Sequence, residues 1–255
     1  MSVLDLFSLA GKRTLVTGAS RGLGRGMALA LADAGADVVC ASSSPDGAAE
    51  TASAVRALGR QAWTVDADLA DASAVARMTD NAERVAGQID ILVNNGGTIA
   101  RYPATEYPAD EWQRVLRTNL DATWQLSQRF GRGMIERGAG KIINVASLLS
   151  FSGGITVPAY TASKHAVAGL TKALANEWAA RNVQVNAIAP GYFATDNTER
   201  LRANEQRFAE ISARIPAARW GQPSDLAGAV VFLASAASDY VNGHILVVDG
   251  GWMAR

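Results

Sequence analysis

The chain lacks the residues that typify disulfide-rich or nucleic-acid-binding proteins. Its 255 residues include one cysteine and two histidines, and its 24 basic residues balance its 24 acidic ones. The single cysteine, Cys40, excludes an internal disulfide, and its position in an apolar run favours a buried, inert thiol over a nucleophile. A net charge of zero means that the chain has no excess of basic residues with which to bind the phosphates of a nucleic acid. We therefore expect no nucleic-acid partner, and no motif in the chain predicts a metal site.

Long hydrophobic runs are missing as well. The longest apolar stretch, residues 226–237, is too short to span a bilayer. The first thirteen residues carry Asp5 early and have no basic segment before their apolar residues, which is unlike a secretory signal. These absences predict a soluble cytoplasmic protein without a membrane partner.

What the chain does have is a regular alternation of apolar runs and helical patterns. Short runs rich in valine and isoleucine predict strands at residues 13–18, 36–41, 61–68, 89–95, 140–147, 183–190 and 244–251. Helical patterns lie between them, at residues 24–35, 47–59, 73–87, 111–138, 160–182 and 223–235. Continuously apolar strands are typical of a sheet covered on both faces. The alternation predicts an α/β fold with a doubly wound parallel sheet of about seven strands, and the length favours one domain over residues 1–255.

Residues 191–224 interrupt this alternation. The segment is polar and rich in arginine, and its pattern predicts two short helices. It follows the carboxyl end of the strand predicted at 183–190, where open α/β sheets bind their ligands. A surface excursion would also explain the composition, but long insertions in compact domains are usually functional. We predict a small helical substrate lid here.

A glycine-rich turn follows the first predicted strand, in the stretch "VTGASRGLG". Gly18, Gly22 and Gly24 stand between a strand and a helix. Glycines allow the backbone to approach a pyrophosphate, and the helix N-terminus adds free N–H groups and the positive end of its dipole. Such turns also arise for packing alone. The order of strand, turn and helix favours a dinucleotide site.

Tyr160 and Lys164, in "YTASKHAV", share one face of a predicted helix. A tyrosine has a pKa of about 10, so a base that works near neutrality needs a stabilised phenolate. An ammonium one turn away favours that charged form. Ser147, at the end of a predicted strand, can bond a substrate carbonyl oxygen at the same point. The Tyr160 and Lys164 pair alone is common by chance and carries weight only with the other motifs.

Taken together, these motifs resemble the short-chain dehydrogenase/reductase family, and the resemblance covers essentially the whole chain. In chain order, the residues that match the family's motifs are Thr17 to Gly24, Asp68, Asn94 to Gly97, Asn119, Ser147, Tyr160, Lys164, Pro190, Gly191 and Thr195. Gly96 departs from the pattern, because the family usually has alanine there. The resemblance implies a single Rossmann-type domain, an NAD(P) cofactor, interconversion of a carbonyl and an alcohol, and a homotetramer.

The resemblance also implies a role for each member of the catalytic tetrad. Tyr160 would exchange the proton with the substrate oxygen, and Ser147 would orient and polarise the carbonyl. Lys164 would lower the pKa of Tyr160 and bond the nicotinamide ribose, and Asn119 would hold a water that links Lys164 to solvent. The implied cofactor contacts are Gly18, Ser20, Arg21, Gly22, Leu23, Gly24, Ser42, Ser43, Asp68, Leu69, Asn95, Gly96, Tyr160, Lys164, Pro190, Gly191 and Thr195.

A narrower resemblance is found in residues 146–164, 186–226 and 247–255, which are similar to the sugar-acid branch of the family. Its members act on substrates of the 2-dehydro-3-deoxy-D-gluconate or gluconate type. A hydroxylated acid needs a cation for its carboxylate, and guanidinium offers bidentate geometry. The candidate arginines are Arg101, which follows a strand's carboxyl end, and Arg202, Arg207, Arg214 and Arg219 in the predicted lid. The substrate contacts we predict are Arg101, Ser147, Tyr160 and Arg202.

Two other functions stay open at this point. One is a carbonyl reductase of another branch, such as a 3-oxoacyl-thioester reductase. The other is an NAD(P)-binding protein without turnover, whose expected mark is a broken tetrad, whereas all four members are present here.

The end of the second predicted strand bears on the choice of cofactor. An acidic residue is commonly expected there to hold the adenosine ribose, and the family's spacing places it at Ser42. Ser42 and Ser43 offer hydroxyl groups instead, and Arg21 supplies a cation in the glycine turn. This combination predicts a pocket for a 2′-phosphate and favours NADP(H). NAD(H) remains an alternative, because relatives in the sugar-acid branch often use it.

Overall fold

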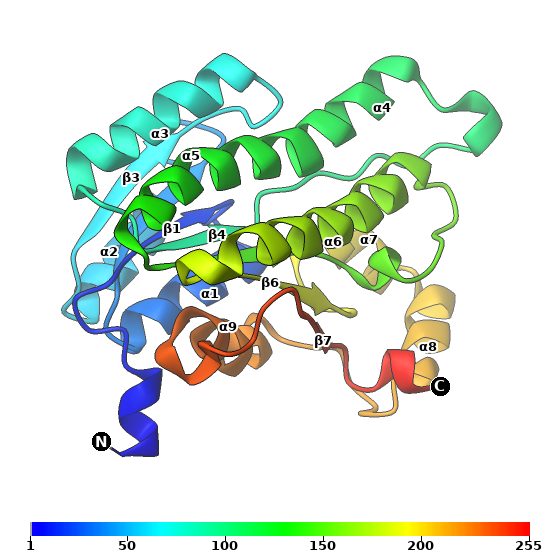
Figure 1. The fold of residues 1–255 in the computed structure, drawn as a ribbon. Helices are drawn as coiled ribbons and strands as arrows, with labels where there is room; N and C mark the ends of the chain where they lie inside the picture. The colour runs from blue at the N-terminus through cyan, green and yellow to red at the C-terminus, as the bar shows by residue number, and fades with distance from the viewer. Residues whose placement is uncertain (1) are drawn as a thin grey trace.

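The computed structural model describes residues 2–255 and contains a seven-stranded parallel sheet (Figure 1). The strands are β1 (Arg13–Thr17), β2 (Asp37–Ser42), β3 (Ala62–Asp66), β4 (Ile91–Asn94), β5 (Gly140–Val145), β6 (Val183–Pro190) and β7 (Ile245–Val248). Their order across the sheet is β3-β2-β1-β4-β5-β6-β7, and every neighbouring pair is parallel. The predicted sheet is confirmed.

Helices cover both faces of the sheet, as the continuously apolar strands predict. They are α1 (Gly22–Asp33), α2 (Ala49–Ala57), α3 (Ala72–Ala86), α4 (Ala109–Leu116), α5 (Ala122–Arg137), α6 (Pro158–Trp178), α7 (Glu199–Ala203), α8 (Glu205–Arg214) and α9 (Ala227–Ala234). Figure 1 shows α3, α5 and α6 on one face and α1 and α9 on the other. None of the helices in the described part of the chain is long and apolar enough to cross a membrane.

The local sequence explains how these helices begin and pack. Asp71 caps α3 by accepting hydrogen bonds from the backbone N–H groups of Ser73 and Ala74, at 2.8 and 3.2 Å. Apolar side chains recur along one side of α3, and Val75, Met78 and Ala82 are buried there. At the other extreme, α9 is apolar on every side, although only Val230, Leu233 and Ala234 are buried.

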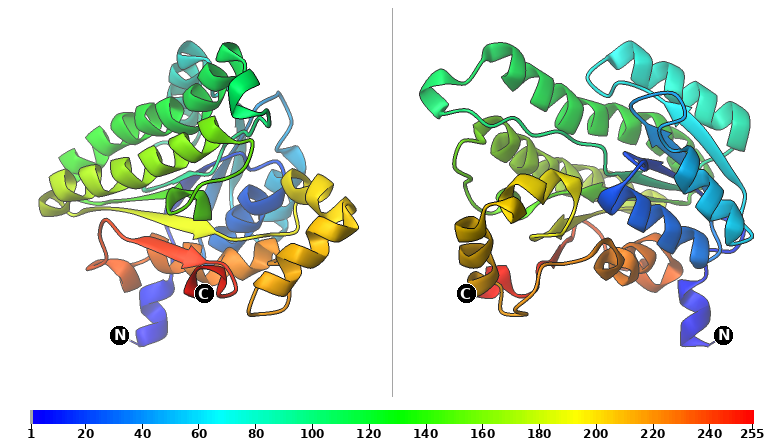
Figure 2. Two further views of the ribbon diagram at one scale, coloured as in Figure 1. Left: turned by 90° about the vertical axis from the view of Figure 1, so that its right-hand side faces the viewer. Right: turned by 180° about the vertical axis from the view of Figure 1, so that it is seen from behind.

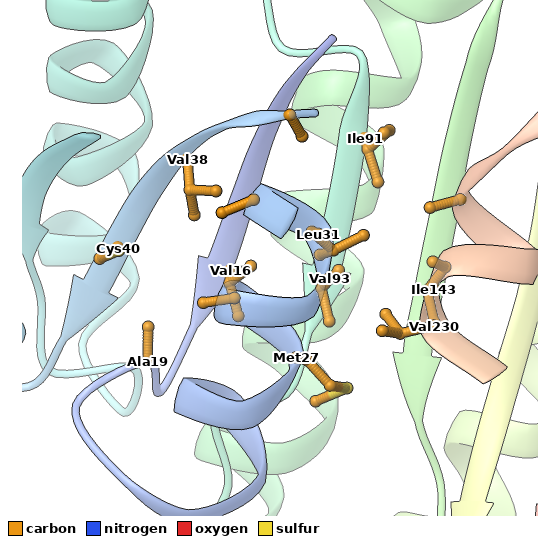
Figure 3. Packing of buried hydrophobic residues seen from close by; sticks show 14 of the residues in the cluster. Val16, Ala19, Met27, Leu31, Val38, Cys40, Ile91, Val93, Ile143 and Val230 are labelled. Carbon is orange, nitrogen blue, oxygen red and sulfur yellow. The ribbon is translucent and has the colours of Figure 1, made fainter. Parts of the chain in front are cut away.

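Alternate side chains of each strand enter two separate cores. Val16 of β1 packs with Met27 and Leu31 of α1 and with Val230 of α9 in the core on one face (Figure 3). Cys40 lies in the same core, and burial raises the pKa of its thiol to about 12. The prediction that Cys40 is buried is confirmed.

The strand order places a crevice between β1 and β4. The chain proceeds from β1 to β2 and β3 on one side, and from β4 to β7 on the other. Open α/β sheets bind ligands at such a switch point, outside the carboxyl ends of the strands. Hydrogen bonds hold the two strand ends together: Thr17 Oγ1 accepts from the N–H groups of Asn95 and Gly96 at 3.0 and 2.8 Å. Asn95 Nδ2 donates back to the Thr17 carbonyl at 2.9 Å.

The predicted lid segment contains two short helices, α7 and α8, as expected. They lie beside the C-terminal residues, where the gold and red segments meet in both panels of Figure 2. Ile211 and Ile215 pack with Trp220 in a small cluster of their own, against which Tyr192 and Trp252 also pack. This cluster, rather than the main cores, fixes α8 to the rest of the chain.

Candidate active site

A cavity of about 1030 Å³ is lined by the segments that follow β1 to β6. The predicted site residues that line it are Gly18, Ser20, Arg21, Gly22, Leu23, Gly24, Ser42, Ser43, Asp68, Leu69, Asn95, Gly96, Arg101, Ser147, Tyr160, Lys164, Pro190, Gly191 and Thr195. Because carboxyl ends of parallel strands share one edge, residues far apart in the sequence meet in this cavity.

The glycine turn fits a dinucleotide phosphate. Gly18 and Gly22 adopt left-handed conformations, with φ of 63° and 55°, which glycine adopts without strain. A Cβ on Gly24 would overlap the Gly18 carbonyl oxygen. Arg21 is the N-cap residue of α1, but its side chain has only hydrogen-bond donors and pairs with Asp196, so it cannot cap the helix. The first N–H groups of α1 therefore face the cavity without a side-chain partner from this residue and can receive an anion.

The residues at the end of β2 leave the ribose site without a carboxylate. Ser42 is buried, and its hydroxyl donates to the carbonyl of Ser44 at 2.9 Å. Ser43 is exposed in the cavity wall. Across the groove, Arg21 Nε lies 3.1 Å from Asp196 Oδ2, and both side chains are mostly exposed. An exposed guanidinium and an exposed hydroxyl therefore line this part of the cavity, and neither repels a phosphate.

Tyr160 and Ser147 meet at the inner end of the cavity. Burial raises the pKa of Tyr160 above its usual value, while the Ser147 hydroxyl and the positive charge of Arg101 act in the opposite direction. Ser147 is an N-cap, because its hydroxyl accepts from the N–H of Leu149 at 3.2 Å. These contacts set a phenol and a hydroxyl side by side, as a carbonyl or alcohol substrate requires.

Lys164 lies beside Tyr160 and is bonded to the backbone of β5. Its Nζ donates to the Val145 carbonyl at 2.6 Å and lies 5.6 Å from the centroid of the Tyr160 ring. Both side chains are therefore neighbours on one face of α6, as the helical spacing predicts. Burial lowers the pKa of Lys164 itself to about 8. The ammonium is desolvated and held toward the end of β5.

Asn119 stands behind the cavity rather than in its wall. It belongs to a π-helical turn, Arg117–Asp121, which joins α4 to α5 within the region predicted as one long helix. Its Oδ1 accepts from the N–H of Thr98 at 2.8 Å, and its Nδ2 donates to the Thr98 carbonyl and to Ser163 Oγ, both at 3.0 Å. Ser163 Oγ in turn donates to the Tyr160 carbonyl at 2.7 Å. Asn119 therefore ties the loop after β4 to the helix that carries Tyr160, and such π turns are frequent at functional sites.

Arg202, predicted as a substrate contact, lies outside this cavity. Its Nη2 donates to the Thr195 carbonyl at 3.2 Å, and the residue lines a smaller depression next to Trp220. The side chain therefore braces the start of the segment 191–224. Arg207 and Arg214 lie on one face of α8, because residues three, four or seven apart along a helix share a face, and that face lines the cavity.

Several residues that line the cavity were not among the predicted site residues. Glu210 comes from α8 and Trp252 from the C-terminal segment, whereas Arg207 and Arg214, on the same face of α8 as Glu210, were candidate arginines that were not chosen as substrate contacts. The spacing of three and four residues along a predicted helix was the available signal for α8. Arg114 of α4 also lines the cavity, and its Nη1 donates to Thr98 Oγ1 at 2.9 Å. No motif signalled Arg114 or Trp252.

Comparison with known proteins identifies the family. Residues 18–253 match the model of a family described as enoyl-(acyl carrier protein) reductase, within the short-chain dehydrogenases and reductases. The chain belongs to the short-chain dehydrogenase/reductase family. It is thus an oxidoreductase, and the order of its motifs agrees with the geometry of the cavity.

Relatives of this short-chain dehydrogenase match it over nearly full length. The 2-dehydro-3-deoxy-D-gluconate 5-dehydrogenase of Bacillus subtilis is 55% identical over 98% of both chains. A crystal structure from Beutenbergia cavernae, described as a candidate NAD(P)-dependent gluconate 5-dehydrogenase with NADP at low occupancy, is 52% identical. It has a TM-score of 0.95 and covers 98% of this chain and all of its own. The gluconate 5-dehydrogenase of Burkholderia cenocepacia, in complex with NADP and tartrate, is 42% identical with a TM-score of 0.95, over the full length of both chains.

Proposed function

We propose that this short-chain dehydrogenase interconverts a secondary alcohol and a ketone on a sugar acid of the 2-dehydro-3-deoxy-D-gluconate or gluconate type, with NADP(H). The observation that carries the proposal is the single cavity that joins the glycine turn, Ser147, Tyr160 and Arg101. The names of its relatives point to the same substrates.

The choice of NADP(H) rests on the adenosine end of the cavity. Ser42 and Ser43 put hydroxyl groups where a carboxylate would repel a 2′-phosphate, and Arg21 is exposed beside the glycine turn. Several related structures hold NADP, among them those from Beutenbergia cavernae and Burkholderia cenocepacia. We assign the phosphate contacts to Arg21 and Ser43, because the Ser42 hydroxyl is already bonded to Ser44. NAD(H) would bind without these contacts and hence less tightly.

The roles of the catalytic residues follow from their positions. When bound, the nicotinamide supplies or accepts the hydride. Ser147 donates a hydrogen bond to the substrate oxygen and holds it beside the Tyr160 hydroxyl. Tyr160 then gives its proton to that oxygen in reduction, or takes it in oxidation. Lys164 would bond the nicotinamide ribose and stabilise the phenolate, and Asn119 holds the loop after β4 through its hydrogen bonds to Thr98.

The carboxylate of the substrate is assigned to Arg101. This arginine follows β4, lines the cavity and is close enough to Tyr160 to lower the pKa of its phenol. Residues 191–224 act as the substrate lid over the same cavity, within a single domain of residues 1–255. A guanidinium near the phenol can bind the carboxylate of an acidic substrate, whereas a neutral sugar offers it no charged partner.

The test is a set of initial-rate measurements with NADPH and with NADH. We expect reduction of 5-keto-D-gluconate or of a 2,5-diketo-3-deoxy sugar acid, with a higher kcat/KM for NADPH than for NADH. Faster reduction of an acetoacetyl thioester would instead indicate the 3-oxoacyl reductase alternative. Binding of NADPH without turnover of any carbonyl would indicate a protein that only binds the cofactor.

We also propose a homotetramer in the cytoplasm. The edge strand β7 and the helix α9 are rich in valine and leucine yet only partly covered, as shown by Leu246 and Val231. Trp124 on α5 is 39% exposed. A second and a third copy would bury these two apolar faces. Light scattering should give four times the chain mass, and a stable monomer would contradict the proposal.

A further inference from the structure

The cations around the cavity fall into two groups. Its basic residues are Arg21, Arg101, Arg114, Lys164, Arg207 and Arg214. Three of them have a carboxylate within ion-pair distance: Arg21 pairs with Asp196 at 3.1 Å, Arg114 with Glu111 at 2.6 Å and Arg207 with Glu210 at 2.7 Å. Lys164 is bonded to a backbone carbonyl. Among the described residues, only the guanidinium groups of Arg101 and Arg214 line the cavity without a carboxylate partner.

Arg214 is held in place by an aromatic ring. Its guanidinium carbon lies 4.1 Å from the centroid of the Trp252 ring, and Trp252 packs on Tyr192 with centroids 4.6 Å apart. Stacking uses the face of a guanidinium and leaves the N–H groups at its edge available for a carboxylate. A stacked arginine loses less conformational freedom on binding an anion than a free one.

The C-terminal segment supports the end of the helix that carries Arg214. Arg255 Nη1 donates to the carbonyls of Ala213 and Arg214, at 3.3 and 3.0 Å, and so caps the C-terminus of α8. Trp252 itself lines the cavity. Residues 252–255 therefore fix both the backbone and the side chain of Arg214.

Arg214 and Arg101 reach the cavity from different elements. Arg101 belongs to the loop after β4 and influences the pKa of Tyr160, so its charge acts near the reacting carbon. Arg214 is the last residue of α8 and lines the same cavity. A substrate carboxylate bound by both arginines would connect the lid to the edge of the sheet. A neutral sugar has no carboxylate and would not make this connection.

Resting on the proposed function, we propose that Arg214, stacked on Trp252, is the second arm of the carboxylate site and makes the enzyme selective for acids. Arg101 holds the carboxylate from the sheet edge, and Arg214 binds it from the lid. Trp252 is a positioning residue, which acts only through Arg214. The selectivity of the site is therefore set partly by the C-terminal segment.

The test uses Arg214→Gln, Arg214→Lys and Trp252→Leu with two ketones. One is 5-keto-D-gluconate, and the other is L-sorbose, which has a hydroxymethyl group in place of the carboxylate. For Arg214→Gln we expect KM for 5-keto-D-gluconate to rise about 10- to 100-fold, as for loss of a charge-assisted hydrogen bond. The kcat/KM for L-sorbose and the KM for NADPH should stay within twofold of wild type. Arg214→Lys should keep part of the affinity, and Trp252→Leu should raise KM about three- to tenfold.

Arg200→Gln is the matched control, because Arg200 is an exposed arginine of the lid outside the cavity wall. Binding of D-gluconate to the NADP⁺-loaded enzyme, measured by calorimetry, gives a second readout that does not need turnover. If Arg214→Gln behaves like Arg200→Gln in both measurements, this inference is wrong while the proposed function stands. If wild type neither binds nor turns over any sugar acid, the proposed function fails first and this inference with it.

Discussion

Lys164 and Tyr160 are one helical turn apart, and the Lys164 ammonium lies 5.6 Å from the centroid of the Tyr160 ring while it donates to the carbonyl of Val145. The lysine is 5% exposed, and burial lowers its pKa from 10.5 to about 8. The fold therefore holds a cation in a place where charging it is unfavourable. Residues kept at such a cost are usually there for function.

Lys164→Met should separate stability from activity. The folded pKa of Lys164 lies below its unfolded value, so the charged lysine lowers the stability of the wild type at pH 7, by about 3 kcal/mol for the full shift. This loss is present below pH 8 and disappears as the pH rises to about 10.5. We expect the variant to lose about 10²- to 10⁴-fold in kcat and to melt no lower than wild type at pH 7. Thermal melts at pH 7 and 9.5 check this, and an advantage of the variant that grows with pH would contradict it.

Arg101→Gln should move the pH profile of oxidation. Arg101 lowers the pKa of Tyr160, so its removal should raise that pKa further above the usual value. Oxidation needs the phenolate, and the rise of kcat with pH should therefore shift to higher pH. Measuring kcat for gluconate oxidation at saturating substrate, between pH 7 and 11, gives the result. An unchanged or lower apparent pKa would mean that Arg101 does not act on the phenol.

Arg21→Ala and Asp196→Asn should change NADPH affinity in opposite directions. Arg21→Ala removes a charge-assisted contact to the 2′-phosphate, so Kd for NADPH should rise about 10- to 100-fold with little change for NADH. Asp196→Asn removes the group that pairs with Arg21, and it should tighten NADPH up to about fivefold, as expected for an exposed ion pair. Fluorescence titration of both cofactors measures these constants. Equal effects on NADPH and NADH would place the 2′-phosphate elsewhere.

Two glycines near the cofactor turn should differ in their tolerance of alanine. A methyl on Gly24 would overlap the Gly18 carbonyl oxygen, so Gly24→Ala should cost at least about 2 kcal/mol and abolish NADPH binding. A methyl on Gly96 would meet the far end of the Leu69 side chain, which can turn away. Gly96→Ala should cost less than about 1 kcal/mol. Denaturant unfolding of both variants distinguishes them, and equal losses would contradict the account of the turn.

The sheet and most of the residues that line the cavity could be predicted from the sequence, because both follow from local patterns. Apolar runs predicted all seven strands, and parallel strands bring the residues after each strand to one edge. The π turn around Asn119 was not predictable in this way, because its residues fit a continuous helical pattern and only the contacts with Thr98 and Ser163 favour the extra residue.

The lid shows why the remaining site residues could not be chosen. The sequence alone does not distinguish Arg202, Arg207 and Arg214 as cavity residues. Which of them faces the cavity depends on where α7 ends and α8 begins. Arg202 turned to a backbone carbonyl, whereas Arg214 stacks on a ring 38 residues later in the chain. Contacts between segments so far apart carry no local signal.

The most direct test of the central claim follows deuterium from NADPH into a sugar acid. The enzyme is incubated with 5-keto-D-gluconate and NADPH deuterated at both C4 positions, and the product is analysed by mass spectrometry and NMR. We predict D-gluconate or its C5 epimer with one deuterium on the carbon that was the ketone. A product without deuterium, or no product while an acetoacetyl thioester is reduced, would contradict the account.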